Sequence, residues 1–142
     1  MKNILYPLFR NALLILLINS LVGSAFAQTA AVIDASKYST LQQALDALPA
    51  NGGIVNIPPG NYEISKPLLL KTENTRLQGS GGSTHLINKN TSGEPAIIVG
   101  SGKGQLFRIE LSGFRISGNP KSGDGIFMEK VQELMITDMT ID

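Results

Sequence analysis

The sequence repeats one apolar rhythm at a fixed interval, and this repeat restricts the possible folds more than any other feature. The four apolar residues of the first copy and their counterparts in the second are Ile109, Leu111, Phe114 and Ile116, then Leu134, Ile136, Met139 and Ile141. A straight strand places inward residues at every second position. The step of three inside each copy therefore predicts a bend, at Ser112-Gly113 in the first and at Thr137-Asp138 in the second.

Earlier strands extend this register. Ile97 and Val99 recur as Ile126 and Met128 at a slightly longer interval, and the glycine-rich segment 100–105 accommodates the excess. Strands that keep their register while loops lengthen are typical of stacked turns in a solenoid. The spacing predicts a parallel coil of about three turns.

One segment with a helical period stands before the first of these strands. Its apolar residues fall on one face of a helix, at Leu41, Ala44, Leu45 and Leu48. Ser39 with Gln42, or Thr40 with Gln43, has the spacing of a capping box, and Pro49 ends the segment. We expect a short amphipathic helix that covers the open first turn of the coil as an N-terminal cap.

Residues 1–27 have the pattern of a secretion signal. Lys2 and Arg10 give a basic start, residues 12–22 are mostly apolar, and Ala25-Phe26-Ala27 is a small-residue cleavage site. An uncleaved anchor is the alternative, but the apolar run is shorter than the roughly 20 residues that span a bilayer. We expect residues 1–27 to be a signal peptide and residues 28–142 to form one domain, secreted or periplasmic and free of the membrane after cleavage.

Charge and cysteine content exclude several classes of function. Without Lys2 and Arg10 the basic and acidic residues nearly balance, so no nucleic acid is expected as a partner. The chain has no cysteine, which excludes disulfides, thiolate zinc sites and cysteine nucleophiles.

An ordered set of short motifs resembles a known superfamily. The helix is followed by Gly52-Gly53, a strand, Pro58-Pro59-Gly60 with Tyr62, a second strand, and Leu77 two residues before Gly79. Residues 34–142 resemble the N-terminal part of a pectate lyase-like protein. The resemblance implies an all-β fold class, a right-handed parallel β-helix (solenoid) of about three coils with an N-terminal amphipathic cap helix. It also implies that the chain is a fragment of a longer protein.

The same resemblance implies a function for that longer parent. The parent would act on an acidic polysaccharide such as pectin, as a lyase, hydrolase or epimerase, with calcium as a cofactor of the full-length protein. One alternative is a non-catalytic extracellular protein that binds glycans or serves as an adhesin or scaffold, and another is a pectin esterase-like enzyme. The resemblance places catalytic residues beyond Asp142, so we expect this chain alone to be inactive and to need no cofactor.

Within the chain we assign no catalytic, cofactor-binding or metal-binding residue. Asp124 lies in a Gly-Asp-Gly turn, and Asp138 and Asp142 fall at corners that lack the six or so oxygens of a calcium site. Arg115 alternates with apolar residues and is expected to point outward above Thr140.

The remaining polar candidates also have structural interpretations. Arg108 is expected to pair with Glu133 across strands. His85 has no recognisable partner spacing, and residues 100–104 lack the spacing of a phosphate-binding loop. Asn90-Thr91-Ser92 is a glycosylation acceptor only in a eukaryotic host. The last strands are expected to expose an apolar edge that self-associates.

Overall fold

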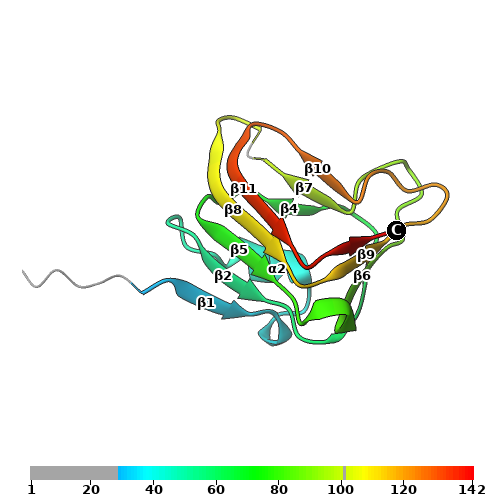
Figure 1. Cartoon of the computed structure of the whole chain (residues 1–142), viewed down its shortest axis with the longest axis horizontal. Coiled ribbons are helices and arrows are strands. Elements are labelled where there is room, and N and C mark those ends of the chain that lie inside the picture. The colour runs from blue at the N-terminus through cyan, green and yellow to red at the C-terminus, as the bar shows by residue number, and fades with distance from the viewer. Residues whose placement is uncertain (1–28, 101) are drawn as a thin grey trace, which may run out of the picture.

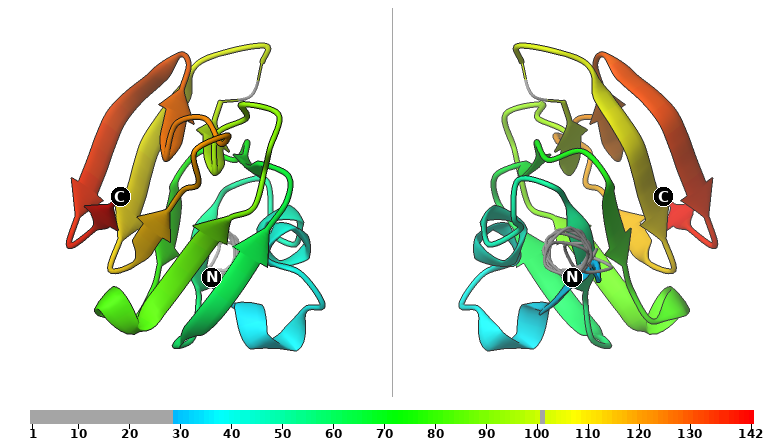
Figure 2. Two further views of the ribbon diagram at one scale, coloured as in Figure 1. Left: turned by 90° about the vertical axis from the view of Figure 1, so that its right-hand side faces the viewer. Right: turned by 90° about the vertical axis from the view of Figure 1, so that its left-hand side faces the viewer.

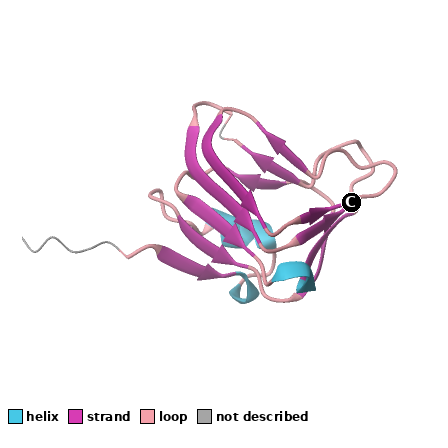
Figure 3. Cartoon of the chain, viewed as in Figure 1, coloured by secondary structure: helices cyan, strands magenta, loops and turns pink. Residues whose placement is uncertain are grey.

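The computed structural model describes residues 29–100 and 102–142, in which three parallel β-sheets surround one core (Figures 1 and 3). The five-stranded sheet has the order β1 (Ala31–Asp34), β2 (Gly53–Asn56), β5 (Thr75–Gln78), β8 (Leu106–Ser112) and β11 (Val131–Thr137). The four-stranded sheet has the order β3 (Gly60–Ile64), β6 (Thr84–Asn88), β9 (Arg115–Ser117) and β12 (Thr140–Ile141). The three-stranded sheet has the order β4 (Leu68–Leu70), β7 (Ile97–Val99) and β10 (Ile126–Met128).

The chain visits the three sheets in turn, so that each layer adds one strand to each sheet. β2, β3 and β4 form one layer, β5, β6 and β7 the next, and β8, β9 and β10 a third. β11 and β12 extend the five- and four-stranded sheets by a further strand. Figure 2 shows the sheets as separate faces around the core.

The strand register that the repeat interval predicted is confirmed. Leu111 pairs with Ile136, and Ile116 pairs with Ile141. The longer interval in the three-stranded sheet is confirmed as well, because Ile126 lies beside Ile97. The predicted bend is present, since β8 ends at Ser112 and β9 begins only at Arg115.

Inward side chains of all three sheets form a single core, which is open at the last layer. Leu111 is 0% exposed and Ile116 is 1% exposed. Their neighbours one layer later, Ile136 and Ile141, are 41% and 51% exposed. Each layer therefore buries its predecessor, and nothing among the described residues covers the last one.

A column of left-handed residues lies near the start of successive strands in the five-stranded sheet. Gly52, Asn74, Arg108 and Glu133 have φ angles of 85°, 55°, 55° and 58°. They precede residues that are aligned by the strand register. The backbone takes the same turn in each layer although only one layer has glycine there.

The α-helix lies beside the three-stranded sheet. Helix α2 (Leu41–Asp46) begins at Thr40, whose side chain accepts a hydrogen bond from the Gln43 N–H at 3.2 Å. The Gln42 side chain pairs with the free edge of β4, accepting from Leu69 N at 2.8 Å and donating to Leu69 O at 3.2 Å. A short 3-10 helix, η1 (Ala35–Lys37), precedes α2, and another, η2 (Gly81–Ser83), precedes β6.

The structure corrects the expected fold class. We predicted a right-handed parallel β-helix (solenoid) of about three coils with an N-terminal cap helix over its first turn. The described residues instead form three separate parallel sheets without a closed solenoid, because strand pairing stops at every corner. The helix does not precede the first strand as predicted, because β1 comes before it. It does pack against β4, the edge strand of the three-stranded sheet in the first layer.

Two features of the predicted organisation need separate mention. The predicted signal peptide, residues 1–27, lies outside the described residues. Within the described part of the chain, no helix has the length and apolar character needed to cross a membrane.

Candidate functional site

The outward face of the four-stranded sheet carries a cluster of polar side chains from three successive strands. The strand register places His85 on β6 beside Arg115 on β9. Strand alternation turns both side chains outward, while Leu86 and Ile116 turn inward. Ser117 lies two residues farther along β9, and Asp142 directly follows β12. The strand spacing of about 4.8 Å brings these side chains within contact distance.

Hydrogen bonds join the four side chains. The Ser117 hydroxyl donates to Asp142 Oδ1 at 3.0 Å, and His85 Nε2 lies 2.7 Å from Ser117 Oγ. Arg115 donates from Nε to Asp142 Oδ1 at 3.1 Å and from Nη2 to Asp142 Oδ2 at 2.6 Å. We call His85, Arg115, Ser117 and Asp142 the outer polar cluster.

The direction of these bonds decides what the cluster can do chemically. A serine hydroxyl has one proton, and Ser117 donates it to the Asp142 carboxylate. The direction of the His85–Ser117 bond depends on the histidine tautomer, and the tautomer with a proton on Nε2 donates to Ser117 Oγ. A base that activates a serine has to accept the serine proton. In that tautomer the arrangement holds and orients hydrogen-bonding groups.

The arginine–aspartate pair stays charged over a wide pH range. Hydrogen bonds from Arg115 and then Ser117 hold the pKa of the Asp142 carboxyl below its usual value. The hydrogen bond to Asp142 raises the pKa of Arg115. The side chains of Arg115 and Asp142 are 43% and 50% exposed, so water screens the pair and its role is to position the two groups.

The cluster brings together three residues that the sequence suggested separately. His85, Arg115 and Asp142 were each considered alone, and Ser117, which links them, was missed. The repeat interval was sufficient to place Ser117 beside Asp142. Arg115 lies beside Thr140 as expected, but its side chain reaches diagonally to Asp142.

The other candidates do not join this cluster. The backbone oxygen of Asp124 accepts a hydrogen bond from Ala96 N at 2.9 Å, in the preceding layer, and no turn is assigned at Asp124. Asp138 occupies the second bend with a φ of 51°. Arg108 and Glu133 form the predicted ion pair at 3.6 Å, with both side chains more than half exposed. Residues 102–104 form an exposed loop.

Two cavities of the described residues bear on ligand binding. Asp124 and Asp142 both line a cavity of about 40 Å³, where two carboxylates provide too few oxygens for calcium. No group of three or more metal-binding side chains is present within residues 29–100 and 102–142. A larger groove of about 440 Å³ runs between the start of α2 and β3, with Thr40, Asn61 and Tyr62 in its walls.

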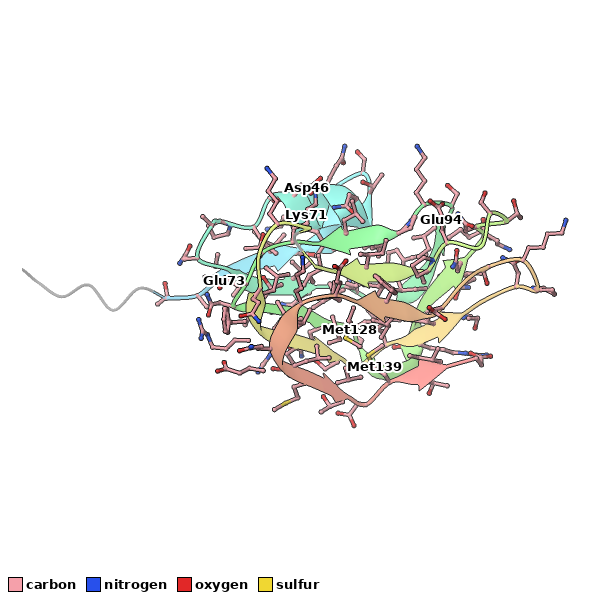
Figure 4. The ribbon with its side chains drawn as sticks, turned by 90° about the horizontal axis from the view of Figure 1, so that it is seen from above. Asp46, Lys71, Glu73, Glu94, Met128 and Met139 are labelled. Carbon is pink, nitrogen blue, oxygen red and sulfur yellow. The ribbon has the colours of Figure 1, made fainter. Side chains whose placement is uncertain are left out.

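A second polar cluster joins the loops that follow the four-stranded sheet. Asn90 is 4% exposed, and its side-chain amide donates to Ser65 O at 3.3 Å in the preceding layer. Asn119 repeats this contact one layer later, donating to Asn88 O and Asn90 O at 2.8 Å each. Glu94, labelled in Figure 4, contacts Asn90 twice. Its carboxylate accepts from the Asn90 amide, and its backbone N–H donates to Asn90 Oδ1. Because its amide is buried and engaged, Asn90 is unsuited to glycosylation in the folded chain.

Comparisons with known proteins give one structural likeness. No family model matches the chain, and no curated protein matches it. A solved structure, ORF18 of Geobacillus virus E2, is similar with a TM-score of 0.69 and 20% sequence identity. The alignment covers 76% of this chain and 25% of the viral chain, so this chain spans about a quarter of that protein. At this identity the likeness shows a shared fold and no shared function.

Proposed function

We propose that this chain is part of an exported protein that acts on an acidic polysaccharide such as pectin, and that the outer polar cluster contacts the sugar chain. The proposal rests on the motif order that resembles pectate lyase-like proteins and on one observation, the side-by-side placement of Arg115 and His85 on an outward face. A guanidinium has five N–H donors, and Asp142 takes two of them, from Nε and Nη2. The others can donate to uronate carboxylates or hydroxyls.

The geometry supports binding without cleavage by the described residues. Glycoside hydrolysis uses two carboxyl groups that flank one bond, and the outer polar cluster has one carboxylate, Asp142. That carboxylate is occupied by Arg115 and Ser117. These contacts favour the non-catalytic alternative, a glycan-binding surface, for this part of the parent protein.

A binding assay with matched variants tests the proposal. We expect the purified chain to bind polygalacturonate in affinity electrophoresis and to release neither unsaturated products nor new reducing ends, with or without calcium. Arg115→Ala should weaken binding about tenfold, the loss of one charge-assisted contact. Arg76→Ala is the control, because Arg76 is similarly exposed and paired with Glu110 but lies on the five-stranded sheet.

Three outcomes would overturn the proposal. They are absence of polygalacturonate binding, equal losses in both arginine variants, and preferential binding of a neutral glycan. Cleavage by the chain alone would contradict the inference that Ser117 and Asp142 only position ligands.

A further inference from the structure

The groove beside β3 is continuous with the outward face that carries the outer polar cluster. Asn61 on β3 lines the groove, and the strand register places it beside His85 on β6. His85 in turn lies beside Arg115 on β9. Strand alternation turns these three side chains outward, because the neighbouring Ile64, Leu86 and Ile116 are buried. The result is a polar column, about 10 Å long over two strand spacings, that runs across the strands and leads into the groove.

The lining of the groove suits a sugar ring. Its volume of about 440 Å³ lies within the range of small-molecule sites. Three of its apolar residues, Leu41, Ile64 and Leu68, are at most 8% exposed. Hydroxyl and amide groups lie among them, at Ser39 and Asn61 for example. A sugar ring has apolar C–H faces and polar hydroxyl edges, so it can use both kinds of contact.

The backbone of β3 adds hydrogen-bonding groups to this groove. β3 is an edge strand, which pairs among the described residues only with β6. Ile64 bonds toward β6, because its carbonyl accepts from Lys89 N at 2.8 Å. In a parallel pair, alternate residues of a strand bond to the same neighbour. The N–H and C=O groups of Asn61 and Glu63 therefore point away from β6, and both residues line the groove.

The groove also has a cationic side chain that can receive a carboxylate. Lys66 lines the groove and is exposed. Among the described residues, no acidic side chain forms an ion pair with Lys66. Glu63, the acidic residue among those described in the groove wall, is paired with Lys89 at 3.4 Å. The charge that a ligand meets in the groove is therefore that of the Lys66 ammonium.

We propose that the groove is a second uronate-binding subsite, so that one acidic oligosaccharide lies across the strands from Arg115, over His85, to Lys66. This inference rests on the proposed function and extends it to a second position. A peptide strand added to β3 is the other occupant that the free backbone groups would suit. It would run along β3 and leave His85 and Arg115 unused, whereas the polar column crosses the strands and favours the oligosaccharide.

Binding of oligogalacturonate to matched variants tests the second subsite. Lys66→Gln should weaken binding about fivefold, as for an exposed ion pair, and Arg115→Ala about tenfold. The combined variant should lose about 50-fold, because distant contacts add in free energy. Lys71→Gln is the control and should bind like the parent chain. Lys71 is also exposed beside α2, but it lines the smaller cavity that contains Asp46 (Figure 4).

Amide NMR at saturating ligand locates the bound oligosaccharide. In the parent chain, oligogalacturonate should shift the backbone N–H signals of Asn61 and Glu63 as well as that of His85. In Lys66→Gln the shifts at Asn61 and Glu63 should shrink, while the shift at His85 remains. A neutral oligosaccharide of the same length should leave the signals of the groove nearly unchanged, because it has no carboxylate for Lys66.

These variants separate the second subsite from the proposed function. If Arg115→Ala weakens binding but Lys66→Gln behaves like Lys71→Gln, the groove is not a subsite, while the outer polar cluster remains one. If Lys66→Gln weakens binding and Arg115→Ala does not, the path across the strands is refuted.

The NMR results can also overturn the inference. Signals of Asn61 and Glu63 that do not respond to oligogalacturonate would do so, as expected if the groove takes a peptide strand instead. Equal shifts from the neutral oligosaccharide would refute the role of Lys66, and absence of all binding would overturn both proposals. Circular dichroism confirms folding, and Asn61→Ala, at a second exposed position of the groove, must also weaken binding.

Discussion

Replacing Asn90 by alanine should lower the free energy of unfolding by about 3–4 kcal/mol. The Asn90 side chain is 4% exposed and fully engaged in hydrogen bonds. Its Oδ1 accepts from Ser92 N at 2.7 Å and Glu94 N at 3.1 Å, while its Nδ2 donates to Ser65 O and to the Glu94 carboxylate. A net value of about 1 kcal/mol for each bond gives roughly 4 kcal/mol, and water that reaches the outer side of Glu94 reduces the loss slightly.

A second pair of variants separates the donor from the acceptor contacts. Asn90→Asp keeps both acceptor contacts, removes both donor contacts and places a second carboxylate beside Glu94. We expect Asn90→Asp to lower the free energy of unfolding by at least half as much as Asn90→Ala does. Adding Glu94→Gln should recover about 1 kcal/mol, because the glutamine amide can donate to the new carboxylate.

Equilibrium denaturation in guanidinium chloride, followed by circular dichroism, measures these changes. The denaturant slope should stay unchanged, and Asn90→Ala should lower the melting temperature by roughly 4 °C for each kcal/mol. A loss below about 1 kcal/mol for Asn90→Ala would show that the buried amide does not tie the layers together. Failure of Glu94→Gln to recover stability in the Asn90→Asp background would contradict the assigned donor contact.

Three further predictions concern packing, backbone conformation and charge. Leu111→Ala should lower the free energy of unfolding by about 3–4 kcal/mol in the same denaturation assay, because Leu111 is 0% exposed. Ile136→Ala, at a position 41% exposed, should lower it clearly less. Gly113→Ala should lower the free energy of unfolding by about 1–2 kcal/mol, because Gly113 has a φ of 67° and a Cβ there would lie 3.0 Å from a backbone oxygen. An unchanged free energy of unfolding would refute the strain assigned to this bend. The depressed pKa of Asp142 means that its pairing with Arg115 is present above the usual aspartate pKa and is lost as the pH falls through the lower folded value. An NMR titration of the Asp142 carboxyl should show a midpoint below that of the unfolded chain and a return toward it in Arg115→Ala.

The sequence predicted strand register well because the core specifies it. A shift by one residue would turn every inward side chain outward. Leu111 and Ile136 therefore had to align, and the bend at Gly113 followed from the step of three in their copies. The same reasoning failed for β1, whose four residues are partly exposed and show no clear alternation. An edge strand with one neighbour leaves a weak sequence pattern.

Backbone conformation was predicted less well than register. Among the left-handed residues near the strand starts, Gly52 and Asn74 have residue types that favour this conformation. Arg108 and Glu133 adopt it at a cost of about 1–2 kcal/mol each, because strand pairing on both sides of the turn imposes the path. Local propensity could not show this, since the requirement comes from neighbouring layers.

The outer polar cluster was not predicted, although the register placed its residues, and the reason is geometric. The register located Arg115 beside Thr140, and it located Ser117 beside Asp142. An arginine side chain, however, can reach a diagonal neighbour across a strand pair, roughly 7–8 Å away. The contact between Arg115 and Asp142 depends on that reach and on the bidentate geometry of the guanidinium. Alignment of Cα positions alone cannot select between the two partners.

The edge strands of the sheets differ in how their backbone groups are protected. At β4, the Gln42 side chain imitates a peptide group by accepting from Leu69 N and donating to Leu69 O. The Asp46 side chain accepts a further bond from the Gln42 amide at 2.9 Å and so fixes its orientation. This edge therefore needs no further strand. β1 and β11 have no comparable side-chain partner among the described residues, and each pairs with one strand of its own sheet.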